Sequence, residues 1–436
     1  MSFFFTCLYI TFVVLRLNEI WIDYLPPNSL DLIVISAFGF MLVEIARGKL
    51  VWPKHLPHQF FILGFYGACM FSDVVWTNLG NLQITAGDIG KIVIVSILIL
   101  VNVDSYRRIQ IVAGVMFAAA FAISIHCYLQ QTRGYGFTGG PDAAPLIVYD
   151  PNHGTVLHVR SKYIGILGDP NDTSLFMVMT IPFILLLIPV RSFISLGVAT
   201  AMITPLAYTI YLAGSRGGFL ALIMTLFASY AQFLKPRNFT IAALGSVFGI
   251  MFLLPSRFIV AGFGQERTML WGSANQIFKE YPIVGTGYGR IVEYYDYQQV
   301  PHNSFVHAYT ELGLVGYMFW FSMILICILG SLRVSRLIPE DEEDRKIIRC
   351  GQIFVPAMIG FCAAGYFLSR TYFVPLFIMV GLNAGLYRMA AEKVGMSKLN
   401  LHCGFSNKHW FYYPLSSICS IFAIYVTILI VNRFLT

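Results

Sequence analysis

Two arginines in this sequence stand where a helix begins, a position that suits a phosphate ligand. Arg216 lies in AGSRGGFLAL, just before an apolar run, and Arg267 opens the helical stretch within ERTMLWGSANQIFKEY. A planar guanidinium binds phosphate oxygens through paired hydrogen bonds, and the free N–H groups of a helix N-terminus favour an anion. Gly217 and Gly218 would let a ligand approach the backbone. We predict that both arginines hold a diphosphate; the alternative is a surface arginine at a helix end.

A second group of polar residues lies in PHNSFVHAYTELGLVG. Asn303 and Ser304 are good N-cap residues, so a helix is predicted to begin there, with His302 at the mouth of the preceding loop. The pKa of a histidine lies near neutrality, so His302 could act as a general base or orient an acceptor hydroxyl. His307 and Glu311 follow Asn303 on the same helix face. Glu311 begins a membrane span and is a functional candidate, whereas a structural core histidine is the plainer interpretation of His307.

Acidic and amide side chains precede an apolar run in GDPNDTSLFMVMTIPF. Asp169 and Asn171 could bind sugar hydroxyls. The structural alternative is an ordinary helix N-cap provided by Asn171 or Asp172.

Three alternating glycines in YPIVGTGYGR, at 285, 287 and 289, have the spacing of a nucleotide-binding loop. No strand precedes them, so the dinucleotide interpretation is rejected. We predict a shaped loop that ends at Arg290. No Cys/His cluster is present, and the two histidines and Glu311 fit no metal motif. No metal or cofactor is therefore predicted.

The chain that must position these residues has the composition of a membrane protein. It has 436 residues, of which 57% are hydrophobic and 12% charged, and a mean hydropathy of +0.70. Soluble domains contain about 25% charged residues. Solid apolar blocks such as SLFMVMTIPFILLLIPV favour spanning helices over the alternating segments of a barrel. We predict an all-α, polytopic transmembrane helical bundle of about 12–13 spans, forming a single integral membrane domain over residues 1–436.

The candidate spans follow the apolar blocks. They cover residues 2–16, 30–46, 59–76, 88–103, 109–128, 172–190, 192–213, 218–234, 239–255, 310–331, 351–368, 372–388 and 415–433. One set of alternate loops carries 17 of the 29 basic residues, which places that set in the cytoplasm. The opposite set includes two long loops, 130–171 and 256–303. The second has a helical apolar spacing at Leu270, Ala274, Ile277 and Phe278, which predicts a short amphipathic surface helix near 266–281.

Four stretches, taken in order, resemble the O-antigen ligase and O-antigen polymerase family of bacterial inner-membrane glycosyltransferases. They are GDPNDTSLFMVMTIP at 168–182, GSRGGFLAL at 214–222, ERTMLWGSANQIFKEYPIVGTGYG at 266–289 and PHNSFVHAYTELGLVG at 301–316. The resemblance implies a multi-pass protein of the bacterial inner membrane with its active site facing the periplasm. It also implies a donor glycan on undecaprenyl diphosphate, a glycan or lipid-linked acceptor, and metal-independent transfer with inversion.

The resemblance also assigns roles. Arg216 and Arg267 would bind the diphosphate, and His302 would activate or position the acceptor hydroxyl. We accordingly predict catalytic roles for His302, Arg216 and Arg267, and substrate-binding roles for Arg290, Asn303, Glu311, Asp169 and Asn171.

The predicted function is transfer of the lipid-linked glycan to an acceptor sugar hydroxyl in O-antigen or exopolysaccharide biosynthesis. The GDPND stretch and FLSRTYF around Arg370 resemble members of the family from exopolysaccharide clusters, a resemblance that favours a polymerase. One alternative is a ligase that acts on lipid A-core. Another is a transporter of an anionic or lipid-linked solute, which would place ionisable residues at mid-membrane, within repeats. A purely structural membrane protein is the third. Membrane lipid is an expected partner, and nucleic acid is not.

Overall fold

The protein is described here by a computed structural model. Its described residues are 1–436 without 23, 27, 139–143, 151–153, 232–262, 295–298, 407–408 and 436. Within these residues, nine helices are long and apolar enough to cross a membrane. The predicted all-α, polytopic class is therefore confirmed, and the protein is a multi-pass membrane protein.

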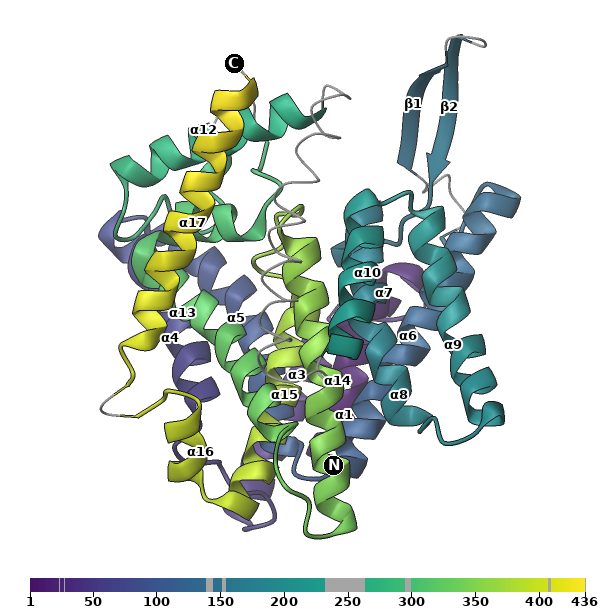
Figure 1. The fold of residues 1–436 in the computed structure, drawn as a ribbon, viewed down its shortest axis with the longest axis vertical. Coiled ribbons are helices and arrows are strands. Elements are labelled where there is room, and N and C mark those ends of the chain that lie inside the picture. Colours follow the sequence, from purple (N-terminus) through teal and green to yellow (C-terminus); the bar gives the residue numbers. More distant parts are fainter. Residues whose placement is uncertain are drawn as a thin grey trace.

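The nine spans run side by side in a bundle (Figure 1). They are α3 (Ser29–Ala46), α5 (Leu79–Asn102), α6 (Tyr106–Arg133), the continuous unit of α7 (Pro170–Thr180), η2 (Ile181–Phe183) and α8 (Ile184–Leu187), α9 (Phe193–Leu212), α13 (Ser304–Val334), α14 (Glu342–Gly365), α15 (Val374–Val394) and α17 (Tyr412–Leu435). Two shorter apolar helices, α1 (Ser2–Leu15) and α10 (Arg216–Ala231), join them, as does α4 (Pro57–Val75). The short helices are α2 (Leu17–Ile20) and α16 (Met396–His402).

These helices overlap the predicted spans, but three of them begin well before the span predicted for them: α5 at Leu79 and not 88, α14 at Glu342 and not 351, and α13 at Ser304 and not 310. Helix α5 begins at Leu79, not at 88, because Asn78 caps it by accepting a hydrogen bond from the backbone N–H of Asn81 at 3.0 Å. The polar turn after Asn78 is therefore already helical. The predicted span 239–255 lies outside the described residues.

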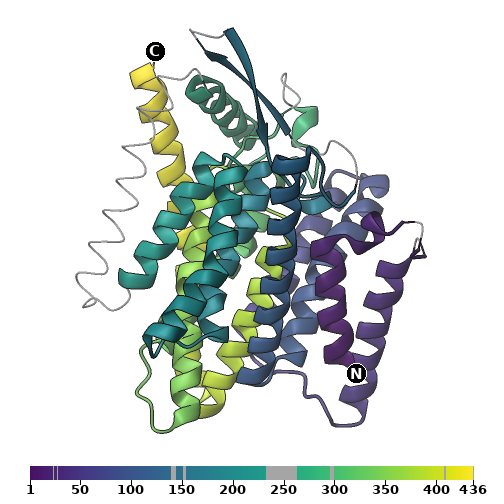
Figure 2. The ribbon, with the colours of Figure 1, turned by 90° about the vertical axis from the view of Figure 1, so that its right-hand side faces the viewer.

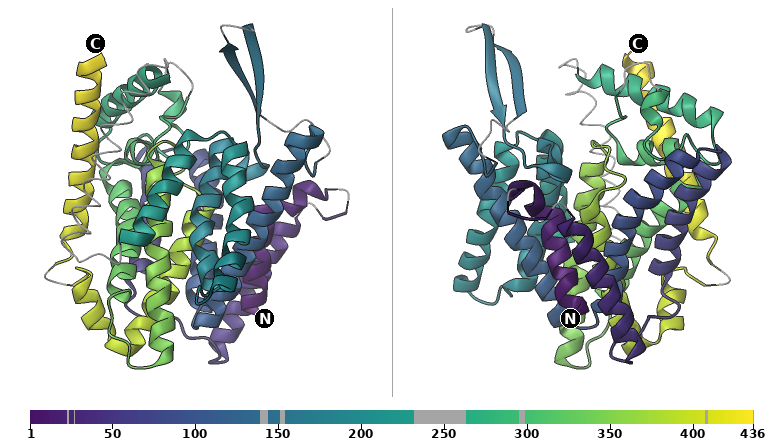
Figure 3. Two further views of the ribbon diagram at one scale, coloured as in Figure 1. Left: turned by 45° about the vertical axis from the view of Figure 1, so that its right-hand side comes forward. Right: turned by 180° about the vertical axis from the view of Figure 1, so that it is seen from behind.

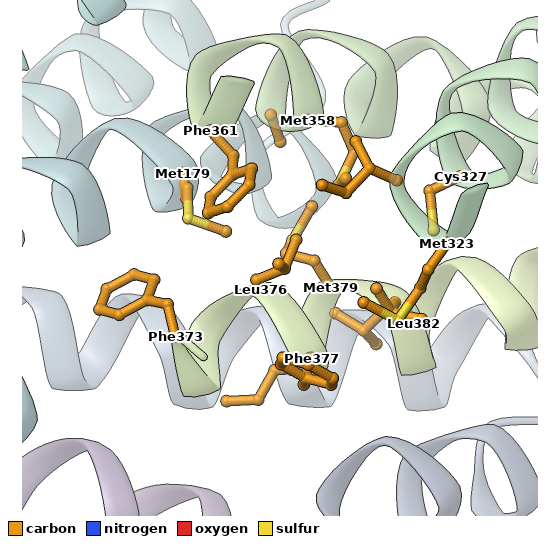
Figure 4. Packing of buried hydrophobic residues seen from close by; sticks show 14 of the residues in the cluster. Met179, Met323, Cys327, Met358, Phe361, Phe373, Leu376, Phe377, Met379 and Leu382 are labelled. Carbon is orange, nitrogen blue, oxygen red and sulfur yellow. The ribbon is translucent and has the colours of Figure 1, made fainter. Parts of the chain in front are cut away.

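The core of the bundle is built from α13, α14 and α15, with α4, α5, α7 and α10 packed around them. Figure 4 shows how sulfur-containing and aromatic side chains fill the space between α15 and its neighbours, with Met323 and Cys327 of α13 facing Met379 and Leu382. Unbranched methionines adapt to irregular gaps between helices. This core fixes the ends of α7, α13 and α14, on which the polar motifs are carried.

The predicted loop 130–171 contains a β-hairpin, although no strand was predicted there. Strand β1 (Ala144–Asp150) pairs antiparallel with β2 (Gly154–Arg160), with Ala144 opposite Arg160. The hairpin extends beyond the end of the bundle (Figure 2), and the short helix η1 (Gly165–Leu167) follows it. Both strands are rich in β-branched residues, which favour this structure. Arg160, the last residue of β2, stands at the base of the hairpin.

Helix α12 (Phe263–Glu280) occupies the predicted surface-helix position. It lies across the same end of the bundle as the hairpin (Figure 3). Leu270, Ala274 and Ile277 are buried, and the ring of Phe278 lies 5.0 Å from that of Tyr309 in α13. The apolar face predicted from the sequence therefore packs on α13 and anchors the helix.

Candidate active site

The turn before α7 is organised by Asp169. Its carboxylate caps α7 by accepting hydrogen bonds from the backbone N–H of Asn171 at 2.7 Å and from the Asn171 side chain at 2.9 Å. The expectation that Asn171 or Asp172 caps this helix is therefore wrong. The side chain of Asn171 turns instead toward α10, where its oxygen accepts a hydrogen bond from Ser215 at 2.7 Å.

Ser215 connects this turn to Arg216. Its hydroxyl caps α10 by accepting a hydrogen bond from the N–H of Gly218 at 3.0 Å. Arg216 is the first residue of α10 and its side chain is exposed. A Cβ atom on Gly218 would stand 2.5 Å from the Cβ of Ser174 in α7. Gly218 thus allows two helices to approach, rather than a ligand, which corrects the reason given for this glycine.

Arg160 completes what we call the α7–α10 corner, which consists of Arg160, Asp169, Asn171, Ser215 and Arg216. The guanidinium of Arg160 donates to the Ala213 carbonyl at 2.9 Å and to Asn171 at 3.2 Å. Burial lowers the pKa of Arg160, the charge of Asp169 opposes that shift, and the nearby charge of Arg216 lowers the pKa further. Two guanidiniums thus repel one another at this corner, an arrangement that an anion would relieve.

An ion pair joins α7 to the segment between α14 and α15. Asp172 is 1% exposed, and both its oxygens accept hydrogen bonds from the guanidinium of Arg370. Burial lowers the pKa of Arg370, but the contact with Asp172 outweighs burial, so the net direction is upward. The Arg370 side chain remains 40% exposed. Its backbone N–H donates to the Ser304 hydroxyl at 2.8 Å, which ties the ion pair to the start of α13.

The start of α13 confirms the predicted cap. The side chain of Asn303 accepts hydrogen bonds from the N–H groups of Phe305 and Val306 at 3.0 and 3.2 Å. His302, immediately before it, is half-buried and adopts a left-handed backbone with φ of 51°. Left-handed backbone is costly for a residue with a side chain and is often found at functional sites.

Helix α12 is tied to the His302 loop by a tryptophan. The indole N–H of Trp271 donates to the carbonyl of Pro301 at 2.6 Å. Arg267 precedes Trp271 by four residues and therefore shares its helix face. This hydrogen bond therefore connects the helix that carries Arg267, the predicted diphosphate residue, to the loop that carries His302, the predicted acceptor residue.

Glu311 lies at the centre of what we call the α13 network, which consists of His307, Glu311, Thr371 and Tyr372. Glu311 is fully buried. Its oxygens contact the His307 imidazole at 3.2 Å and accept a hydrogen bond from the Tyr372 hydroxyl at 2.8 Å. The other imidazole nitrogen lies 3.2 Å from the Thr371 hydroxyl. The predicted stacking of His307 and Glu311 is confirmed, and both serve an internal network that connects α13 to the segment before α15.

The alternating glycines serve a backbone contact. Helix α13 breaks at Gly313, which has φ of 62°, and the freed carbonyls of Thr310 and Glu311 accept hydrogen bonds from the N–H groups of Thr286 and Gly287 at 3.1 and 2.9 Å. A Cβ on Gly285 would stand 2.3 Å from the carbonyl oxygen of Glu311. These glycines therefore allow the loop to pair with a broken helix, which agrees with the rejection of a nucleotide-binding loop.

Arg290 lies apart from the two arginine-bearing helix starts. Its guanidinium pairs with Glu293 at 3.0 Å, and its side chain lies beside Gly287. A Cβ on Gly287 would also approach the buried carboxylate of Asp73, which accepts hydrogen bonds from Asn81 and Thr85 at 2.6 Å each. Arg290 thus belongs to the side of the loop that packs on α4 and α5.

Sequence reasoning missed three contributors. Arg160, Asp172 and Arg370 were not predicted as site residues, although the outer loops are rich in arginine. The available signal was FLSRTYF, a polar interruption between two apolar runs. Within the described residues, no group of three or more His, Cys, Asp or Glu side chains could hold a metal ion.

The polar motifs lie at one end of the bundle, and a comparison with known families matches part of the chain that carries them. Residues 200–321 match the family model of the O-antigen ligases. The match covers part of the chain and supports the resemblance found in the sequence to the O-antigen ligase/polymerase family of membrane enzymes. The matched residues run from α9 through the first half of α13 and include Arg216, Arg267, Arg290 and His302. Comparison with curated proteins found no match.

The match to this ligase/polymerase group supports glycosyltransferase-type activity on lipid-linked glycans in a membrane. The α7–α10 corner is only partly inside the match, because Arg160, Asp169 and Asn171 precede residue 200.

Proposed function

We propose that the protein transfers a glycan from a polyprenyl diphosphate, undecaprenyl diphosphate in bacteria, to a sugar hydroxyl at the periplasmic face of the inner membrane. The acceptor oxygen attacks the anomeric carbon, the bond from that carbon to the diphosphate oxygen breaks, and the configuration inverts. His302 takes the proton of the hydroxyl as the bond forms. Arg216 and Arg267 neutralise the charge that develops on the leaving diphosphate.

One observation carries this proposal: a continuous path of contacts joins the motifs. Asn171 binds Ser215, which precedes Arg216. Asp172, the next residue, binds Arg370, whose backbone binds Ser304, two residues beyond His302. The proposed diphosphate and acceptor residues are therefore held by one rigid polar framework, and such positioning lowers the barrier for a reaction between two bound substrates.

The residues predicted to bind substrate have two kinds of role in this proposal. Asp169 and Asn171 hold the α7–α10 corner, Asn303 caps α13, and Glu311 is enclosed in the α13 network. We assign these four to positioning. Arg290 keeps its predicted substrate-binding role, in the loop after α12.

A transporter is the rival function, and the break in α13 is the feature that would suit one. Broken transporter helices use their freed carbonyls to coordinate a solute. Here the carbonyls of Thr310 and Glu311 are occupied by the loop at 286–287. This arrangement favours a structural role for the break and supports the enzyme.

The test is deletion of the gene followed by gel analysis of surface polysaccharide and lipopolysaccharide, with complementation by wild type, Arg216→Ala or Arg133→Ala. Arg133 is exposed at the end of α6 and serves as the matched control. Loss of long chains, with single repeat units left, would establish the polymerase that we favour. Full-length chains retained on the lipid carrier, with bare core, would establish a ligase. An unchanged glycan profile would refute both and leave the transporter.

A further inference from the structure

A large cavity opens at the end of the bundle opposite the hairpin and α12. Its volume is about 1350 Å³, above the roughly 300–1,000 Å³ of most small-molecule sites. It lies between the start of α6, the segment after α8, and the first half of α14, and none of the predicted catalytic residues lines it. The cavity therefore requires an explanation separate from glycan transfer.

One face of α14 forms its main wall, and the residue types on that face change with depth. From the helix start inward, the polar lining residues are Glu342, Arg345, Lys346, Arg349 and Gln352, with Ile348 among them, and Ile353 and Pro356 follow. Their spacing of three or four residues keeps them on one side of the helix. All the charged lining residues of α14 lie toward the helix start, where Ile348, Leu337 and Pro339 also line the cavity, whereas the lining nearer the membrane interior, at Ile353, Pro356 and Pro182, is apolar. This gradient matches that of a lipid, with a polar head and apolar chains.

Positive charge dominates the polar lining. Five cationic side chains line the cavity against one acidic side chain, Glu342; the cations are Arg107, Arg191, Arg345, Lys346 and Arg349. Lys346 lies 3.8 Å from Glu342, which offsets one charge. Over the described part of the chain, Arg107, Arg191 and Arg345 are exposed and form no ion pair. The excess positive charge is thus available to an anion.

The base of the charged region is rigidly built. Helix α8 ends at Leu187, so the carbonyls of its last turn lack helical partners. Arg349 donates to the Leu185 carbonyl at 2.6 Å, and Gln110 donates to the Leu186 carbonyl at 2.9 Å. These bonds hold α6, α8 and α14 at a fixed separation. The cavity is therefore a formed site between three helices and not a loose gap.

We propose that this cavity binds the phosphate-bearing head of an anionic phospholipid, with the acyl chains against its apolar inner wall. Basic pockets between transmembrane helices at one membrane face are suited to such headgroups. The apolar wall distinguishes a lipid from a soluble phosphate, which would gain nothing from Ile353, Pro356 and Pro182. Because the bound lipid would join α6, α8 and α14, it would also stabilise the fold.

The test uses full-length protein in detergent, stripped of lipid and then mixed with phosphatidylglycerol or phosphatidylcholine, with bound lipid counted by native mass spectrometry. The variant Arg107→Gln/Arg191→Gln/Arg345→Gln removes three lining charges. The control Arg47→Gln/Lys49→Gln/Lys54→Gln removes three exposed charges from the α3–α4 loop at the same end of the bundle. Arg191→Gln alone, in an exposed loop, serves if the triple variant does not fold.

Wild type and control should retain phosphatidylglycerol over phosphatidylcholine. The triple variant should bind it about 100-fold more weakly, since each basic group near an anionic lipid contributes roughly fivefold. The single variant should lose about fivefold by the same reasoning. Equal retention of phosphatidylglycerol by variant and wild type would overturn the proposal. Displacement of the lipid by excess glycerol phosphate, without chains, would overturn the lipid as occupant and assign the site to a soluble phosphate ester.

Discussion

The α7–α10 corner and the α13 network lie at the same end of the bundle and treat their charges in opposite ways. At the corner, Arg216 stands exposed at a helix N-terminus, with a second guanidinium nearby. In the network, Glu311 is enclosed and both its oxygens have partners within the protein. One region leaves a charge available to a ligand, and the other satisfies it internally.

This difference distinguishes charges that can bind a ligand from charges that hold the helices together. An ionisable residue at the start of a membrane span is a functional candidate, and Glu311 meets that description. Its surroundings show why the criterion is incomplete: a buried charge must be paired and hydrogen-bonded, and pairs of that kind also lock helices together. In this protein, an exposed charge with a second charge of the same sign nearby is a better sign of a ligand site than a buried, paired charge.

The largest effect is expected from Arg216→Ala. The residue is exposed, so the temperature of unfolding should not change, whereas the rate of glycan transfer should fall by about 10²–10³-fold, the usual cost of removing one charge-stabilising donor. Arg216→Lys should recover part of the rate, because lysine keeps the charge and loses the fork. The measurement is polymer formation in membrane vesicles with a lipid-linked glycan. A rate equal to that of Arg133→Ala would remove Arg216 from the site.

A substitution at Gly285 tests the close backbone contact between the glycine loop and α13. In Gly285→Ala, the new Cβ would lie 2.3 Å from the Glu311 carbonyl oxygen, and φ is +68°. Left-handed backbone costs roughly 1–2 kcal/mol, and overpacking adds about 1–3 kcal/mol. Gly289→Ala is a matched control, since its φ is +71° with no atom within 4 Å of the new Cβ. Gly285→Ala should unfold at a lower temperature than Gly289→Ala. Equal unfolding temperatures would refute the close pairing of loop and helix.

The sequence was sufficient to predict the bundle. Apolar blocks of about 20 residues can satisfy their backbone only as spanning helices, so the spans themselves were located. The predicted spans left out the first turns of α5, α13 and α14, because the apolar blocks begin only after them. The hairpin β1–β2 was missed because its strands have only seven residues each and lie in a loop without a strong periodic signal.

The sequence was less informative about which side chains contact one another across the fold. Asp172 and Arg370 are 198 residues apart, and no local pattern indicates that they meet. Asp172 was interpreted as a possible cap because caps are local, whereas ion pairs depend on the packing of helices. The predicted stacking of His307 and Glu311 succeeded for the complementary reason, since residues four apart in a helix are always neighbours.

Variants of Glu311 test whether this residue has a structural role or binds the substrate. Glu311→Ala would leave the Tyr372 hydroxyl and the His307 imidazole buried without their partner, at a cost of roughly 1–3 kcal/mol of folding free energy. Glu311→Gln keeps an acceptor for Tyr372 and should be milder. Thermal unfolding and the transfer rate should fall together in both variants. A variant that unfolds like wild type but transfers slowly would place Glu311 at the substrate and contradict the assigned positioning role.

The smallest effect is expected from Asn171→Ala, which removes the acceptor for Ser215 and Arg160. A hydrogen bond of this kind contributes about 1 kcal/mol, so the transfer rate should fall roughly fivefold. If Asn171 acts only by positioning the turn that bears Arg216, Asn171→Ala/Arg216→Ala should be no slower than Arg216→Ala, because contacts that act as a unit are not additive. Fully additive losses would show instead that Asn171 contacts the substrate on its own, and the corner would then contain two independent ligand-binding groups.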